Sequence, residues 1–149
     1  MKFAEEPITE ALLAEVKPLL EKHWEEVSSY PDIPLDPDYE IYLQIQKTGH
    51  IRAFSARDGN GVLVGYSVFF IRNNSHYRKT IYALNDIIFI KKECRGHGGF
   101  FISWCEDELR KSGVIVCQYH IKVKYDWSAG LLRSGYIFED KILAKRLDK

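Results

Sequence analysis

The chain has 149 residues, 46% of them hydrophobic and 28% charged, and its 21 basic and 21 acidic side chains cancel to a net charge of zero. These values predict a single globular domain over residues 1–149. The balanced charge argues against a protein that binds nucleic acid or the surface of an anionic membrane. The three cysteines lack metal-type spacing, which predicts that there is no metal centre, and their odd number favours a reducing compartment. The chain shows no signal-like start and no apolar run of membrane length, so we expect a cytoplasmic protein.

The N-terminal third is predicted to be helical. Thr9 is a suitable N-cap for a helix whose apolar residues recur at helical spacing as far as Trp24. Pro18 lies inside this pattern and is expected to kink the helix or split it. The Pro- and Asp-rich stretch 30–37 predicts an extended connector, and a second short helix is expected over 38–47.

The middle of the chain is predicted to be β, with a hairpin turn at Asp58-Gly59-Asn60-Gly61. The expected elements are strands over 51–56, 62–71 and 80–90, a helix ending near 111, a strand over 114–120, a short helix over 125–134 and a last β segment over 136–147. Phe101, Cys105 and Leu109 recur at helical spacing and are predicted to pack against the sheet. The order ααβββαβαβ predicts a mixed α/β sheet with helices on both faces.

The most informative stretch joins an apolar strand that contains Asp86 to a Gly-rich turn and a helix. The turn consists of Arg95, Gly96, His97, Gly98 and Gly99. A glycine-rich turn at a helix start lets backbone N–H groups approach an anion closely, and the helix dipole favours negative charge there. The pattern therefore favours a phosphate or pyrophosphate ligand, with a tight turn that binds nothing as the alternative. Asp86, upstream, is a candidate base for a transferase that uses a phosphorylated carrier.

This order of elements resembles the GNAT superfamily of N-acetyltransferases over roughly residues 62–147. In that family a strand with an acid ends in a turn of the form Arg/Gln-x-x-Gly-x-Gly/Ala, which grips the pyrophosphate of acetyl-CoA. Asp86 takes the place of the acid, Ile90 that of a Val, and Arg95-Gly96 the start of the turn. Gly135-Tyr136 match the Gly-aromatic pair late in the family. The compact chain also looks like the short GNAT-like proteins of tailed bacteriophages.

The resemblance implies a mostly antiparallel central sheet with splayed strands and an N-acetyltransferase that uses acetyl-CoA as co-substrate. Asp86 would deprotonate an amine, which is a small molecule, a protein lysine or a protein N-terminus. Backbone N–H groups near Phe89 or Ile90 would hold the thioester oxygen, while residues 95–99 bind the pyrophosphate. The family's late Tyr aligns with Leu131, so the candidate proton donors are Tyr119, His120 and Tyr125, each of which has a purely structural alternative.

The Gly-rich turn departs from the family pattern, and two alignments of it are open. With Arg95 first, Gly98 takes the first glycine place and Phe100 the last. With a turn shorter by two residues, Gly96 and Gly98 take the glycine places and Glu93 the basic one. These departures support a second hypothesis, a non-catalytic GNAT-fold module that acts in protein–protein interaction or in a virion or host function.

Two further expectations concern partners. The aromatic residues of the segment 30–42 and Trp127 either wall an amine site through cation–π contacts or pack in the core. The fold is compatible with a homodimer. Nucleic-acid binding is the weakest reading, because scattered basic residues come with zero net charge and no recognisable motif.

Overall fold

The computed structural model describes residues 1–148 and contains a five-stranded sheet in the order β1-β2-β3-β4-β5. The strands are β1 (Lys2–Glu5), β2 (Ile51–Arg57), β3 (Leu63–Asn73), β4 (Ile81–Ile90) and β5 (Val116–Tyr119). Neighbouring strands from β1 to β4 run antiparallel, and β5 runs parallel to β4. This confirms the predicted mixed, mostly antiparallel sheet. The short edge strand β1 was not predicted, because four residues are too few for a period-two pattern to be recognised.

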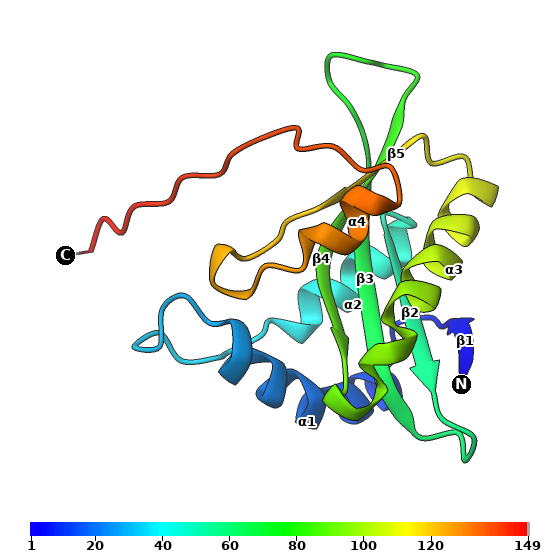
Figure 1. The fold of residues 1–149 in the computed structure, drawn as a ribbon, viewed down its shortest axis with the longest axis vertical. Helices are drawn as coiled ribbons and strands as arrows, with labels where there is room; N and C mark the ends of the chain where they lie inside the picture. The colour runs from blue at the N-terminus through cyan, green and yellow to red at the C-terminus, as the bar shows by residue number, and fades with distance from the viewer. Residues whose placement is uncertain (149) are drawn as a thin grey trace.

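Helices cover both faces of the sheet, as predicted (Figure 1). α1 (Glu10–Val27) and α2 (Tyr39–Thr48) lie on one face, and α3 (Gly98–Lys111) lies on the other. The remaining pieces are η1 (Lys92–His97), η2 (Val123–Tyr125) and α4 (Ser128–Arg133). The helix predicted over 125–134 is thus two pieces, the 3-10 helix η2 and the six-residue helix α4. Asp126 and Trp127 separate them, because their backbones are not helical.

The first helix begins where the sequence predicts it, because the Thr9 hydroxyl accepts the N–H of Leu12 at 3.2 Å. α1 continues through Pro18 as one helix, so the predicted split does not occur. Pro18 faces solvent, where the carbonyl that loses its intrahelical partner can bond to water. The next helix, α2, is likewise capped by its preceding residue, since the Asp38 carboxylate accepts the N–H of Ile41 at 3.1 Å.

Apolar packing on the two faces of the sheet fixes the layers. Phe101, Cys105 and Leu109 of α3 are almost completely buried against Phe54 and Phe69, which confirms the stripe predicted from the sequence. On the opposite face, the side chains that pack together come from α1 and from strands β3 and β4. They are Leu12, Leu19, Leu63, Tyr66 and Phe89.

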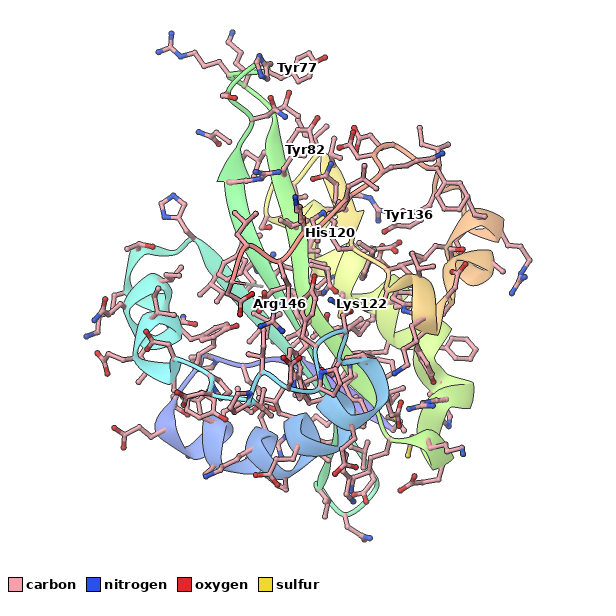
Figure 2. All side chains as sticks on the ribbon, turned by 90° about the vertical axis from the view of Figure 1, so that its left-hand side faces the viewer. Tyr77, Tyr82, His120, Lys122, Tyr136 and Arg146 are labelled. Carbon is pink, nitrogen blue, oxygen red and sulfur yellow. The ribbon has the colours of Figure 1, made fainter. Side chains whose placement is uncertain are left out.

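The last predicted β segment, over 136–147, is wrong: no strand follows β5 within the described residues up to 148. The segment is an extended tail that leaves the body of the molecule (Figure 1). Its alternating apolar residues suit a strand, but a strand forms only against a partner, and the tail lies on no strand edge. Near its end the tail carries Arg146, which is labelled in Figure 2. The Arg146 guanidinium donates to the Asp32 carboxylate at 2.7 Å and lies over the ring of Tyr30.

Candidate functional site

A β-bulge places Asp86 at the centre of the sheet. In the β3–β4 ladder, Asn85 pairs with Phe69 and Ile87 pairs with Val68, so Asp86 is an extra residue without a partner. Nδ2 of the buried Asn85 lies 3.0 Å from Ser67 Oγ, 3.1 Å from the Val68 carbonyl and 3.2 Å from the Ile87 carbonyl. The Asn85 side chain therefore holds the bulge from inside, and Asp86 points to the other face.

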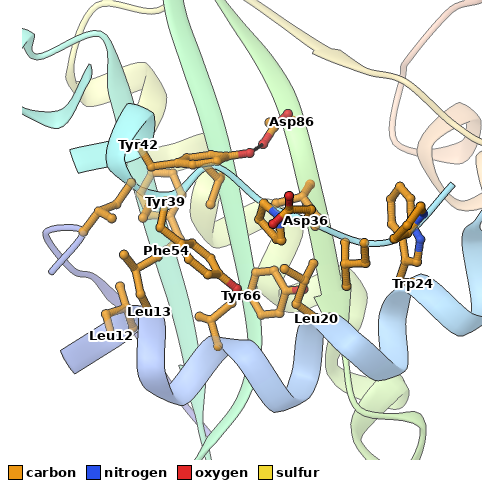
Figure 3. Close-up of a pocket in the computed structure, with 18 of the residues that line it drawn as sticks. Leu12, Leu13, Leu20, Trp24, Asp36, Tyr39, Tyr42, Phe54, Tyr66 and Asp86 are labelled. Carbon is orange, nitrogen blue, oxygen red and sulfur yellow. Dashed lines mark hydrogen bonds between the residues drawn. The ribbon is translucent and has the colours of Figure 1, made fainter. Parts of the chain in front are cut away.

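On that face Asp86 lies at the rim of a pocket with a volume of about 420 Å³ (Figure 3). The pocket is enclosed by α1, the connector before α2, the start of α2 and the sheet. Its lining includes Leu13, Val16, Leu20 and Trp24 of α1, Ile33 to Pro37 of the connector, Tyr39 and Tyr42 of α2, and Tyr66, Val68 and Ile87 of the sheet. Much of the predicted aromatic segment 30–42 thus walls this pocket, whereas Trp127 packs on Tyr119 at a centroid distance of 5.6 Å.

The carboxylate of Asp86 accepts a hydrogen bond from the Tyr42 hydroxyl at 2.8 Å (Figure 3). Burial raises the pKa of Asp86 above its ordinary value, and the bond from Tyr42 opposes this rise. Burial also raises the pKa of the Tyr42 hydroxyl, which therefore stays a proton donor. A carboxyl group with a raised pKa at a pocket rim is suited to accept a proton from a bound ligand.

The sheet opens beside Asp86. Strands β4 and β5 pair only from Tyr82–Val116 to Asn85–Tyr119, so within residues 1–148 no strand pairs with the second half of β4 on that side. The N–H of Lys91 donates to the Val64 carbonyl at 2.8 Å, which sets the alternation of the β3–β4 ladder. By that alternation, the N–H of Ile90 points into the opening and the N–H of Phe89 points toward β3. The resemblance assigns one of these two N–H groups to the thioester oxygen. Only the N–H of Ile90 points in the direction that this role needs.

The Gly-rich turn forms η1 and the first turn of α3. None of its three glycines has a positive φ, and a Cβ atom at Gly96, Gly98 or Gly99 would meet nothing within 4 Å. Neither backbone conformation nor packing therefore requires glycine there, and in the helical part each glycine costs about 1 kcal/mol relative to alanine. The backbone at these three glycines is therefore sterically open.

Arg95 ties this turn to two other elements. Its guanidinium donates to the Glu26 carboxylate of α1 and to the Tyr125 hydroxyl of η2, both at 2.5 Å, and its Nε donates to the Ile90 carbonyl at 3.3 Å. Sequence reasoning missed Glu26, because an acid near the end of an amphipathic helix looks like an ordinary surface residue. His97 is exposed immediately before α3 and makes no cap bond to it.

The three candidate proton donors lie in different surroundings. Tyr119 packs against the rings of Phe69, Trp127 and Tyr136, on the sheet face opposite to Asp86, and burial raises the pKa of its hydroxyl far above the usual range. His120 is exposed just after β5. The hydroxyl of Tyr125 accepts a hydrogen bond from Arg95, so Tyr125 contacts the predicted Gly-rich turn directly.

Comparison with protein-family models and with curated protein sequences gives no match. Solved structures do match. A ribosomal-protein-alanine N-acetyltransferase from Brucella melitensis is 16% identical, with a TM-score of 0.70, and the match covers 99% of this chain and 100% of that one. An aminoglycoside acetyltransferase from an uncultured soil metagenomic sample, in complex with sisomicin, is 14% identical, with a TM-score of 0.73 and coverage of 97% and 93%. An aminoglycoside N-acetyltransferase in complex with CoA is 13% identical, with a TM-score of 0.68 and coverage of 97% and 98%.

The chain thus has the fold of the GNAT acetyltransferases, as the resemblance predicted. The similarity to the bacteriophage proteins stays a prediction. Among the described residues, no group of three His, Cys, Asp or Glu side chains could hold a metal ion. No helix within residues 1–148 has both the length and the apolar character needed to cross a bilayer.

Proposed function

We propose that this protein transfers the acetyl group of acetyl-CoA to a primary amine, with Asp86 as the general base. The observation that carries the proposal is the bulge in β4. It sets a carboxylate with a raised pKa at a pocket rim, at the point where β4 and β5 stop pairing. Matching structures of acetyltransferases, one of them with CoA, support the same reading.

In the proposed reaction acetyl-CoA supplies an acetyl group activated as a thioester. Asp86 accepts a proton from the ammonium group of the amine, directly or through water, and so frees the nitrogen lone pair. As the nitrogen–carbon bond forms and the carbon–sulfur bond breaks, the N–H of Ile90 stabilises the charge on the carbonyl oxygen. Tyr125 or His120 donates a proton to the departing thiolate, and the second proton that the nitrogen loses as the amide forms restores this donor through water. The glycines of the turn let the backbone approach the pyrophosphate.

The first test is acetyl-CoA binding by isothermal titration calorimetry. Gly98→Glu places a negatively charged side chain in the open space at the turn and is expected to abolish binding. Gly130→Glu is the matched control, because Gly130 is also a helical glycine whose Cβ would meet nothing within 4 Å, but it lies in α4. Equal binding by the wild type and Gly98→Glu would contradict the proposed carrier site.

The second test is release of free CoA in the presence of an amine. Asp86→Asn keeps the size of the side chain and removes its ability to accept a proton. Loss of a general base typically lowers the rate by about 10²–10⁴-fold. Substitution of Tyr125 by Phe and of His120 by Gln would separate the two proton donors, since only the true donor should lower kcat.

The non-catalytic module is the alternative function, and one observation favours it. The guanidinium of Arg95 is already bonded to Glu26 and Tyr125, and the N–H of Gly98 bonds to the Arg95 carbonyl, which leaves fewer free donors at the turn. A well-folded protein that does not bind acetyl-CoA would support this alternative.

A further inference from the structure

The chemistry of the pocket beside Asp86 restricts the class of amine that it accepts. Most of the lining consists of aliphatic and aromatic side chains, contributed by α1, the connector and the sheet. Burying a hydroxyl group against such a surface without a hydrogen-bond partner weakens binding, because the group loses its bonds to water. A sugar amine, which carries several hydroxyl groups, would leave most of them unpaired there.

The charged groups of the pocket all have the same sign. Asp36 and Asp86 line it, and no Lys, Arg or His is among the lining residues. A ligand with a carboxylate or phosphate group would be repelled by both acids and would find no cation to pair with. A ligand with one ammonium group and no anionic group is the complement of this arrangement.

The aromatic residues are placed to receive the same kind of ligand. Trp24, Tyr39 and Tyr42 enter the pocket from α1 and α2, and Tyr42 also holds the Asp86 carboxylate at 2.8 Å (Figure 3). Aromatic rings attract an ammonium group through cation–π contacts and cover an apolar ligand body at the same time. The volume of about 420 Å³ is within the usual range for small-molecule sites.

We infer that the acceptor is a small apolar primary amine without an anionic group, such as an arylalkylamine. Its ammonium group lies at Asp86, and its apolar body lies between α1 and the connector. This inference rests on the proposed function for the role of the pocket. This acceptor class differs from that of the matched aminoglycoside acetyltransferases, because aminoglycosides are rich in hydroxyl groups.

The test uses three amines that differ in one property each. 2-Phenylethylamine is the expected acceptor, phenylalanine adds a carboxylate to the same skeleton, and glucosamine replaces the apolar body by a hydroxylated ring. The kcat/KM for CoA release should be at least roughly tenfold higher with 2-phenylethylamine than with the other two, as one unpaired buried group predicts. A preference for phenylalanine or glucosamine would overturn the inference and leave the proposed function standing.

Calorimetry with the amines alone separates this inference from acetyl transfer. If 2-phenylethylamine binds more tightly than phenylalanine but no amine is acetylated, the pocket assignment holds and the proposed function fails. If 2-phenylethylamine does not bind and is not acetylated, the inference is wrong. Binding should weaken roughly ten- to hundredfold in Asp86→Asn, because a hydrogen-bonded ion pair is lost.

A matched pair of variants locates the apolar body of the ligand. Val16→Gln puts an amide into the α1 wall of the pocket and should weaken binding of 2-phenylethylamine by about tenfold. Ile41→Gln makes a similar change on α2 at a side chain that is 48% exposed and outside the lining. It should leave binding unchanged. Equal binding by Val16→Gln and the wild type would contradict the assigned pocket.

Discussion

Replacing Tyr42 by Phe tests how the protein sets the proton affinity of Asp86. The variant removes one hydroxyl and keeps the ring, which stacks on Phe70 at a centroid distance of 6.2 Å. The bond from Tyr42 favours the charged form of Asp86, while burial favours the neutral form. Without the bond only burial remains, so the pKa of Asp86 should rise further.

The size of this rise follows from the strength of the lost bond. A hydrogen bond to a charged group contributes about 1.5–3 kcal/mol, and one pKa unit corresponds to about 1.4 kcal/mol. Because Asp86 lies at the rim and is partly solvated, the lower end of this range applies, and we expect a rise of about one unit. A base acts in its deprotonated form, so the acid limb of kcat/KM should move to higher pH by the same amount.

Two measurements check this prediction. An NMR titration of the Asp86 carboxyl carbon gives its pKa whether or not the protein is an enzyme, and the pH profile of CoA release gives the kinetic value. Tyr39→Phe is the control, because Tyr39 also lines the pocket but its hydroxyl has no hydrogen bond to Asp86 in the structure. An unchanged titration in Tyr42→Phe, or an equal shift in Tyr39→Phe, would refute the reasoning.

Three further predictions concern stability and association. Gly65→Ala should lower the free energy of unfolding by about 1–3 kcal/mol in urea titrations, because its Cβ would lie 2.9 Å from the Phe89 carbonyl oxygen; Gly59→Ala, with open space around it, should have little effect. Burial lowers the pKa of His23 from 6.5 to about 4, so between these two pH values the unfolded chain is protonated at His23 and the folded chain is not. The free energy of unfolding should therefore fall by roughly 2–3 kcal/mol as the pH drops from 6.5 to 4. A His23→Leu variant that showed the same fall in stability would contradict this. A chain that ends after Tyr136 should associate less than the full chain in light scattering over a range of concentrations, because Ile137 and Leu143 are 82% and 96% exposed; identical behaviour of both chains would contradict the prediction.

The parts of the fold that could be predicted from the sequence are those with local causes. Thr9 and Asp38 cap their helices through bonds that span three residues, and the stripe of Phe101, Cys105 and Leu109 follows from helical periodicity. The tail over 136–147 has the pattern of a strand, but its pairing depends on a partner that no local pattern specifies. Local sequence therefore predicted the conformation that this segment favours but not its place in the structure.

In the candidate site, too, the sequence predicted the residue with a local signal but not those placed by tertiary contacts. Asp86 was predicted as the acid on the strand, and the two residues that control it were not assigned to that role. Tyr42 reaches it from a helix 44 positions away, and Asn85 holds the bulge through contacts to β3. Both effects come from tertiary packing, and the only signal for them in the sequence was the aromatic segment that includes Tyr42.

The single guanidinium of Arg95 links the two ends of the proposed reaction. An anion bound at the turn must compete with Glu26 for this group, and Glu26 belongs to α1, the helix that also walls the amine pocket. If the anion displaces Glu26, one anchor of that wall is released; if both share the guanidinium, the helix is held more firmly. In either case the two substrates would not bind independently, and this ion pair would set the sign of the coupling between their affinities.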